Sequence, residues 1–256
     1  MTEFTVCIPA AGSGTRMNSE TPKQFLPLHG RAVLLHTLDL FARMERCREI
    51  IIAGEESSLK PLVEQADLSV PVRIVPGGAR RQDSVASAIR AVQGGDTVVL
   101  VHDAARPCVQ AAHVQAVADA VQASGAAVLA VPARDTLKEV RDGTITRTID
   151  RNAVWQAQTP QGARAALYLD AFRHADEQGI EATDDVSLIE FIGHPVRVVE
   201  GSATNIKITV PEDLAVAAAI LREQGRTGTQ LERYEPQRHS GTKDGSASVK
   251  DTEVSQ

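Results

Sequence analysis

FTVCIPAAGSGTRM, residues 4–17, is the stretch that decides the fold, because a short apolar run passes directly into a loop of small residues. The run Phe4–Pro9 predicts a buried strand. In a doubly wound sheet, ligands bind beyond the carboxyl ends of the strands, and small residues there let backbone N–H groups approach phosphates. The stretch therefore predicts an α/β fold with a phosphate-binding loop after its first strand.

Two common glycine motifs do not fit this loop. Met17 stands where a dinucleotide fingerprint requires a small residue, and the chain has no Gly-Lys-Ser/Thr of a P-loop here. Arg16 and Lys23, the latter in Pro-Lys-Gln, are the cations expected beside a triphosphate. The plainer alternative is a glycine-rich turn with two solvated cations. The glycines alone do not decide between the two, but the added Arg and Pro-Lys favour phosphate binding.

Strand-like and helical patterns alternate through the first half of the chain. Strands are expected at 49–53, 70–75, 97–101 and 126–131, and helices at 33–44, 57–66, 82–92 and 112–123. Repeated strand–helix–strand units predict a doubly wound, mostly parallel sheet.

The pattern changes after residue 131. Residues 136–140 and 145–149 predict a β-hairpin around an Asp-Gly turn, and its short polar strands need another surface to pack on. We expect residues 132–155 to form a protruding arm that embraces a second subunit. Beyond it, helices are expected at 163–177, 185–191 and 211–223, and strands at 196–199 and 206–210. Residues 1–224 would form one domain, and the polar residues 225–256 a disordered tail.

The composition of the chain indicates which partners it is expected to bind and in which compartment it is expected to act. The formal net charge of −6 argues against binding to nucleic acid or to a membrane surface, both of which favour a basic face. The three cysteines are far apart and show no metal-ligand spacing, so we expect free thiols in a reducing compartment. No secretory signal or membrane span is recognisable, and we expect a cytoplasmic protein.

Further polar residues follow the later strands. Gly78 and Ser84 flank the start of an expected helix, whose N–H groups suit a base or ribose, although an ordinary capped turn explains Arg81 and Asp83. Asp103 ends a strand, where it would bind Mg²⁺, directly or through water, or accept from a substrate hydroxyl. Lys207 interrupts an apolar run, which usually directs a lysine outward into water but also allows it to point into a site.

Several motifs in this order resemble the 2-C-methyl-D-erythritol 4-phosphate cytidylyltransferases of the non-mevalonate isoprenoid pathway. The motifs are PAAGSGTRM, PKQF, GGARRQDSV, VHDAARP, RDTLKEV, DRN, QTPQ, TDD and NIKIT, and the resemblance runs from about residue 4 to residue 221. It implies a Rossmann-like nucleotidyltransferase fold and a homodimer. It also implies CTP and methylerythritol phosphate as substrates, with Mg²⁺ as cofactor. No fused cyclase domain of the bifunctional relatives is expected.

The resemblance assigns roles to particular residues. Arg16 and Lys23 would stabilise the transition state. The acceptor would be positioned by Arg151, Lys207, Asp103, Arg106, Thr136, Thr159 and Thr183, with Thr136 and Arg151 acting across the dimer interface. The nucleotide would be held by Ala10, Ala11, Gly12, Gly14, Gly78 and Ser84. Ala79 departs from the acidic or polar residue of some members, which removes a side-chain contact there.

Three alternatives remain open on the sequence. A ribitol 5-phosphate cytidylyltransferase would share the fold and the reaction, although Ala104-Ala105 and Thr183-Asp184-Asp185 resemble the methylerythritol enzymes more closely. A sugar-1-phosphate nucleotidyltransferase shares the glycine-rich start but not the HDAARP, QTPQ and NIKIT motifs. A non-catalytic nucleotide-binding regulator would keep the fold, but the retained cations argue against it.

Overall fold

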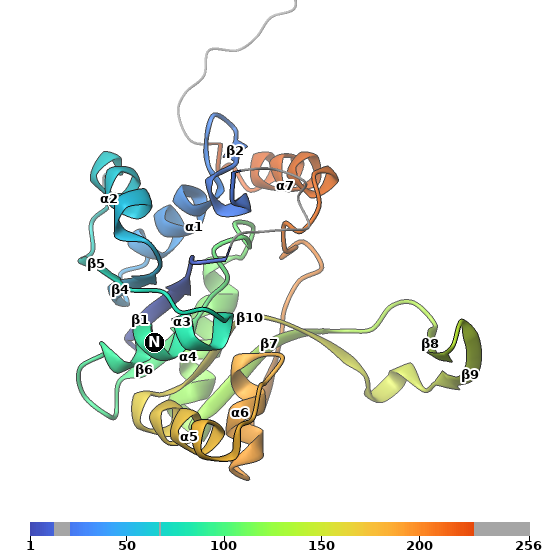
Figure 1. Ribbon diagram of the computed structural model, residues 1–256. Helices are drawn as coiled ribbons and strands as arrows, with labels where there is room; N and C mark the ends of the chain where they lie inside the picture. Colours follow the sequence, from blue (N-terminus) through green and yellow to red (C-terminus); the bar gives the residue numbers. More distant parts are fainter. Residues whose placement is uncertain (13–20, 67, 228–256) are drawn as a thin grey trace, which may run out of the picture.

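The computed structural model describes residues 1–12, 21–66 and 68–227, which build a sheet covered by helices on both faces (Figure 1). Within these residues the central sheet has seven strands in the order β11-β7-β10-β6-β1-β4-β5. The strands are β1 (Phe4–Pro9), β4 (Cys47–Ala53), β5 (Val72–Val75), β6 (Val98–Val101), β7 (Ala126–Pro132), β10 (Trp155–Arg164) and β11 (Arg197–Glu200).

Strand direction confirms the predicted mostly parallel sheet. β1 pairs in parallel with β4 and β6, β4 with β5, and β11 with β7. β10 is antiparallel to both of its neighbours, β6 and β7. The carboxyl ends of β1, β4, β5 and β6 therefore meet at one edge of the sheet.

Alternating side chains of the strands divide the core into two layers. Val6 and Ile8 pack on one face, and Cys7 between them packs on the other. The first face is covered by α1 (Val33–Ala42), α2 (Glu56–Gln65) and α4 (Ala111–Ser124), and the second by α3 (Arg81–Arg90), α5 (Ala165–Gln178) and α6 (Asp185–Phe191). This two-sided cover explains the nearly continuous apolar strands of the sequence.

A third, smaller apolar cluster joins the C-terminal helix α7 (Glu212–Glu223) to the body. It packs Ala217 and Leu221 of α7 against Leu28 and Cys108. Leu28 belongs to a short hairpin of β2 (Pro27–Leu28) and β3 (Arg31–Ala32), which follows the single-turn helix η2 (Lys23–Phe25). The hairpin and η2 were not predicted, and the cluster fixes them beside the end of β1.

The predicted arm is present as β8 (Leu137–Arg141) and β9 (Thr144–Ile149), followed by the short helix η3 (Arg151–Ala153). Figure 1 shows the arm extending from β7 and β10 well away from the body of the chain. Asp142 and Gly143 both have positive φ, as the two-residue turn between right-twisted strands requires.

Two predictions of secondary structure are wrong. Residues 206–210, expected as a strand, form no regular element, because Ile208 N–H donates to Ala105 O outside any ladder and Asp213 accepts from residues 209 and 210. Residues 155–164 form β10, so the helix expected from residue 163 begins only at residue 165.

Some predictions lie outside the described residues. These concern Gly14 and Arg16 in the glycine-rich loop and, from residue 228 onward, the expected tail. Throughout the part of the chain that the structure does describe, every helix is too short or too polar to cross a lipid bilayer.

Candidate functional site

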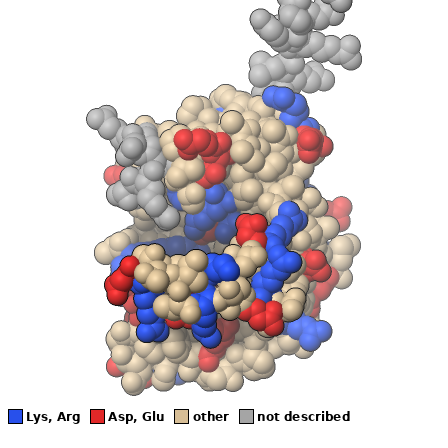
Figure 2. Space-filling view, turned by 90° about the vertical axis from the view of Figure 1, so that its right-hand side faces the viewer, with Lys and Arg blue, Asp and Glu red and all other residues tan. Residues whose placement is uncertain are grey.

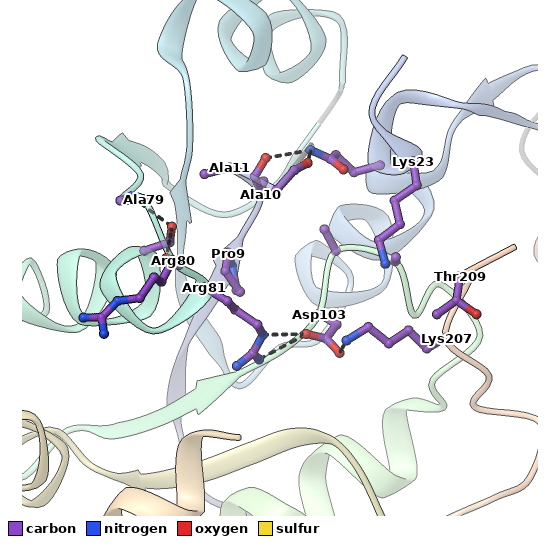
Figure 3. Close-up of a pocket in the computed structure, with 16 residues that line it drawn as sticks. Pro9, Ala10, Ala11, Lys23, Ala79, Arg80, Arg81, Asp103, Lys207 and Thr209 are labelled. Atoms are coloured by element: carbon purple, nitrogen blue, oxygen red, sulfur yellow. Dashed lines mark hydrogen bonds and ion pairs between the residues drawn. The ribbon is translucent and has the colours of Figure 1, made fainter. Parts of the chain in front are cut away.

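A cavity of about 320 Å³ opens where β1, η2, α3 and the loop after β6 meet, and we call it the strand-end cavity (Figure 3). It is at the predicted edge of the sheet. It is lined by Pro9, Ala10, Ala11, Gly12, Lys23, Gln24, Gly78, Ala79, Arg80, Arg81, Ser84, Asp103, Ala104, Ala105, Lys207 and Thr209. The predicted nucleotide residues that the structure describes are thus brought together with Lys23, Asp103 and Lys207.

Gln24 shapes the loop after β1. Its side-chain amide donates to the carbonyl oxygens of Ala10 at 2.7 Å and Gly12 at 3.1 Å, and the Gln24 side chain is buried. The sequence singled out the neighbouring Lys23 but gave Gln24 no role. Because these carbonyl groups are turned toward Gln24, the loop has a fixed course along the cavity wall.

The glycines before α3 allow two loops to approach closely. A Cβ on Gly77 would lie 2.4 Å from the Cβ of Ala11, and one on Gly78 would lie 2.2 Å from the Cβ of Asp83. Gly78 N–H donates to the hydroxyl of Ser84 at 3.0 Å. Gly78 and Ser84 therefore line the cavity, as predicted, and also hold one turn together.

The capped helix start that the sequence offered as the alternative for Arg81 and Asp83 is formed by Arg80 and Asp83, so it holds for Asp83 and is wrong for Arg81. Arg80 N–H donates to the Asp83 carboxylate, and the two side chains also form an ion pair at 2.6 Å. Figure 3 shows the Arg80 side chain directed away from Asp103. Of the two neighbouring arginines, Arg81 is the one that reaches the interior of the site.

Asp103 is a carboxylate surrounded by cations. Its oxygens lie 3.1 Å from the Arg81 guanidinium, 2.9 Å from Lys207 Nζ and 3.4 Å from Arg106 Nε. Figure 3 shows Arg81 and Lys207 approaching it from opposite sides. Burial alone would raise the pKa of Asp103, but these cations outweigh burial and hold the pKa well below its usual range. Asp103 is therefore ionised.

Lys207 points into the site because its segment is fixed from several directions. Arg106 donates to Asn205 O at 2.8 Å, and Ile208 N–H donates to Ala105 O at 2.8 Å. Arg106 thus braces the segment that carries Lys207. The sequence left the direction of Lys207 open, and the structure places its amine beside Asp103.

Thr159 and His102 lie behind Asp103. The Thr159 hydroxyl accepts from Asp103 N–H at 3.1 Å and lies 3.1 Å from His102 Nδ1. Both side chains are buried. Burial lowers the pKa of His102 to about 4, so its ring is neutral near pH 7. His102 also packs edge-on against Phe41, as a residue with a structural role would.

The remaining predicted acceptor residues lie elsewhere in this single chain. Thr136 and Arg151 are exposed on the arm, where Arg151 donates to Arg134 O, and Thr183 is exposed just before α6. Within the described residues, none of these three lines the strand-end cavity. The structure thus does not bring them to Lys207 within one chain.

A second hollow of about 440 Å³, the arm-base cavity, adjoins the first. Lys207 and Thr209 line both cavities, and Arg106, Arg134 and Asp135 line the second. Lys207 therefore stands between the strand-end cavity and the cavity at the foot of the arm. Figure 2 shows Lys and Arg side chains gathered in the middle of the face that the arm overhangs.

Whether the strand-end cavity can hold a metal ion depends on the carboxylate of Asp103. It is the one carboxylate among the described residues of the strand-end cavity, and no cluster of three His, Cys, Asp or Glu suited to a metal occurs in the described chain. Both Asp103 oxygens already accept from cations, so direct ligation would displace one of them. The donor set fits an ion held mainly by phosphate oxygens and water.

Arg81 and Asp185 are functional candidates that the sequence analysis missed. The Arg81 guanidinium donates to both oxygens of Asp185, at 2.8 and 2.9 Å. Asp184 caps α6, because its carboxylate accepts from Ser187 N–H, whereas Asp185 faces inward and is buried. Arg81 and Asp185 each stand beside an identical residue, Arg80 and Asp184. The sequence therefore did not indicate which of the two arginines or of the two aspartates points into the site.

Comparison with known proteins identifies the family of this chain. The family model described as 2-C-methyl-D-erythritol 4-phosphate cytidylyltransferase matches residues 4–223. Curated proteins of that name are 40% identical over 226 residues in Bacillus licheniformis and 45% identical over 224 residues in Symbiobacterium thermophilum. Each match covers 87% of this chain, and 97% and 94% of the relatives.

A solved structure of similar shape carries the same name. The Thermus thermophilus 2-C-methyl-D-erythritol 4-phosphate cytidylyltransferase is 38% identical, with a TM-score of 0.72, and the match covers 86% of this chain and all of that one. The family model, the relatives and the fold agree along the whole domain. The chain belongs to the 2-C-methyl-D-erythritol 4-phosphate cytidylyltransferase family.

Proposed function

We propose that this protein transfers the CMP part of CTP to 2-C-methyl-D-erythritol 4-phosphate. The products are 4-diphosphocytidyl-2-C-methyl-D-erythritol and pyrophosphate, in the non-mevalonate route to isoprenoids. Family membership supports the reaction. The observation in this chain that carries it is the position of Lys207, which stands between the strand-end cavity and the arm-base cavity and so lies where two phosphates would meet.

The nucleotide occupies the strand-end cavity in this proposal. Ala11 lies close to Gly77, so the loop of residues 10–12 and Gly78 line the same cavity, where their backbone groups would contact the base and ribose, with Ser84 beside them. Gly14 is proposed as a further nucleotide-binding residue. The triphosphate lies toward Lys23, and Arg16 is proposed as the second cation on it. These positions match the preference of phosphates for small-residue loops and fixed cations.

Mg²⁺ is proposed to arrive with CTP. When bound, it neutralises charge on the phosphate oxygens. The chain supplies Asp103 on the same wall, which reaches such an ion through water while Lys207 and Arg106 keep their contacts with it.

The acceptor phosphate attacks the α-phosphorus of CTP in line with the leaving pyrophosphate. A phosphate oxygen is already ionised near pH 7 and needs no general base, which agrees with the burial of His102 away from the cavity surface. Lys207 draws the acceptor phosphate toward the nucleotide, and Arg151, Thr136 and Thr183 complete its site. Positioning and charge stabilisation supply most of the catalysis.

Replacement of Lys23 tests the transition-state role. Lys23→Ala is expected to lower kcat by about 10²–10³-fold, because one preorganised donor to a charged transition state contributes roughly 3–4 kcal/mol. Lys60→Ala removes an exposed lysine on α2 and serves as the matched control. Steady-state pyrophosphate release measures both variants, and equal activity of Lys23→Ala and the parent contradicts the role.

We also propose that the enzyme is a homodimer in which each arm completes the partner's site. Thr136 and Arg151 lie on an arm that extends away from its own body. The arm also exposes a cross-strand apolar pair, Val140 opposite Ile145, with 53% and 59% of their surfaces accessible. A second copy of the chain would cover this pair and bring Arg151 to the arm-base cavity.

Mixing two inactive variants tests the shared site. Lys23→Ala keeps a normal arm, and Arg151→Ala keeps a normal strand-end cavity. If arms act across the interface, equal mixing with subunit exchange restores about one quarter of the parent activity, because half the dimers are mixed and one of their two sites is intact. A mixture that remains as inactive as its components contradicts the proposal.

The acceptor is tested by comparing 2-C-methyl-D-erythritol 4-phosphate with ribitol 5-phosphate in the presence of CTP and Mg²⁺. Turnover with the first alone supports the proposed function. Preference for the second would assign the chain to the ribitol enzymes with the same fold and mechanism. CTP binding without turnover of either acceptor would indicate a regulator.

We propose the cytoplasm as the site of action. The free cysteines Cys7, Cys47 and Cys108 are all buried, which suits a reducing compartment. The net charge of −6 agrees with substrates of low molecular weight, bound by local cations, rather than nucleic acid.

A further inference from the structure

Arg81 joins two buried carboxylates that come from distant parts of the chain. Its guanidinium lies 2.8 Å from Asp185 at the start of α6 and 3.1 Å from Asp103 after β6. The side chains of Asp185 and Asp103 are only 3% and 9% exposed. The planar guanidinium of Arg81 thus connects the start of α6 with the loop after β6.

The connection continues to Lys207. Asp103 uses one oxygen for Arg81 and the other for Lys207, so charges alternate in the order Asp185, Arg81, Asp103, Lys207. Figure 3 shows the part of this row that lies in the cavity. Gln161 fixes the far end, because its side-chain oxygen accepts from the N–H group of Asp185 at 2.9 Å.

Such a row is a weak source of stability. Removing charges from water costs free energy that their attraction rarely recovers in full, and apolar replacements of buried ion pairs are often neutral or stabilising. A row in which each charged group contacts the next does, however, hold the side chain at its end in one position. That side chain belongs to Lys207, which stands between the two cavities.

We propose that Arg81 and Asp185 are positioning residues that act through Asp103 to hold the Lys207 amine where the acceptor phosphate meets the nucleotide. This inference rests on the proposed function. Arg81 is also the first residue of α3 and lies within the turn that the Gly78–Ser84 hydrogen bond closes on the nucleotide side. One side chain therefore ties the nucleotide wall to the acceptor lysine.

Direct contact of Arg81 with substrate is the competing explanation, because Arg81 itself lines the cavity. Asp185 separates the two explanations. It is buried and is absent from the described lining of both cavities, so it acts only through its neighbours. A loss of turnover on changing Asp185 therefore reports on the row and not on substrate contact.

The test compares Asp185→Asn with Asp184→Asn in the full-length protein. Asp185→Asn is expected to lower kcat with methylerythritol phosphate on the order of tenfold, with the KM for CTP within about twofold of the parent. Asp184→Asn changes the cap of the same helix and its contact with Gln161, but Asp184 contacts neither Arg81 nor Asp103 nor Lys207. It is therefore expected to alter stability and leave kcat within about twofold. Arg81→Lys, which cannot span both carboxylates, is the second variant and is expected to share the defect.

The double variant Asp185→Asn with Lys207→Ala decides whether the effect passes through Lys207. It is expected to be no slower than Lys207→Ala alone, because the row then has no lysine to position. Additive losses, or a kcat for Asp185→Asn within about twofold of the parent, would overturn the proposal.

A second readout does not depend on turnover. Loss of the Asp185 partner lets Arg81 compete for Asp103, so Lys207 is expected to react faster with an amine-directed label than in the parent, measured by mass spectrometry against Lys60. An unchanged labelling ratio contradicts the proposal. If the parent itself transfers CMP to neither acceptor, the proposed function fails, while the labelling still decides whether the row holds Lys207.

Discussion

His102 and Asp103 are adjacent and both buried, and they carry opposite charges when ionised. Burial disfavours the charged form of both, which lowers the pKa of His102 to about 4 and would raise that of Asp103. Only Asp103 has cations at hydrogen-bonding distance, and these reverse the effect of burial. The chain thus keeps one neutral and one ionised group side by side by its choice of partners.

The neutral state of His102 makes the stability of the protein depend on pH. The unfolded histidine takes up a proton near pH 6.5, but the folded one does so only near pH 4, so the unfolded state binds more protons between these values. Lowering the pH from 7 to 5 is therefore expected to remove about 2 kcal/mol of the free energy of unfolding through this residue. Urea unfolding at several pH values measures it.

His102→Gln supplies the comparison, because glutamine cannot titrate. Its free energy of unfolding should depend less steeply on pH between 4 and 6.5 than that of the parent. Parallel curves for the two proteins would show that His102 is not the group concerned. Carboxylates with a lowered pKa, such as Asp103, also reduce the free energy of unfolding when the pH falls further. They contribute equally to the curves of both proteins.

Sequence patterns identified most residues of the site but not their directions. Lys23, Asp103 and Lys207 were predicted from their positions after strands or within a motif, and they line one cavity. The inward turn of Lys207 was not predictable, because it depends on Asp103, a residue far away in the sequence. Arg81 was explained as part of a capped turn for the same reason, since its carboxylate partner Asp185 lies in another element.

At the scale of elements, the segment 206–210 carries a site residue without being a strand. Asp213, in the first turn of α7, accepts from Thr209 N–H at 2.7 Å, from the Thr209 hydroxyl at 2.9 Å and from Val210 N–H at 3.0 Å. These bonds replace the ladder that a strand would have provided. The helix thereby holds the end of the segment on which Lys207 lies.

Asp213→Ala is expected to weaken acceptor use without affecting the core. Loss of a carboxylate that accepts from backbone N–H groups at a helix start costs about 1 kcal/mol, which corresponds to roughly fivefold in kcat/KM for the acceptor if Lys207 loses its fixed place. Asp213→Asn retains an accepting oxygen and should lose less. Glu212→Ala, an exposed neighbour, is the control. Steady-state kinetics with both substrates distinguish the three, and equal values for all would contradict this role of Asp213.

The strand β10 shows where periodicity fails. Its sequence contains Pro160 and Gly162, which are disfavoured in central strands, and the loop-like QTPQ motif concealed it. The pairing of β10 with β7 shifts register between Ala157 and Gln161, and this irregular stretch accommodates the proline. The buried strands β1, β4, β6 and β7, by contrast, were predicted closely, because both of their faces are apolar.

The homodimer that we propose depends on the exposed pair Val140 and Ile145, which a second copy of the chain would cover. Introducing Asp at both positions is expected to convert a dimer into monomers and abolish turnover, because two charges would have to be buried at the interface. Sedimentation velocity measures the change. Val216→Asp on α7, where the valine is likewise exposed, is the control. A double variant that remains dimeric and active would exclude the arm as the contact.

The two ends of the arm are held together by the sheet itself. Pro132 at the end of β7 lies opposite Trp155 at the start of β10, so the chain leaves and re-enters the body at neighbouring points. An insertion with fixed, adjacent ends can change in length or sequence without disturbing the surrounding sheet. The hairpin can thus be replaced by the hairpin of a relative without changing the sheet. In the dimer that we propose, a chimera carrying a foreign hairpin would keep its own nucleotide chemistry while acquiring a different pairing preference, and two such enzymes could share one cell without forming mixed assemblies.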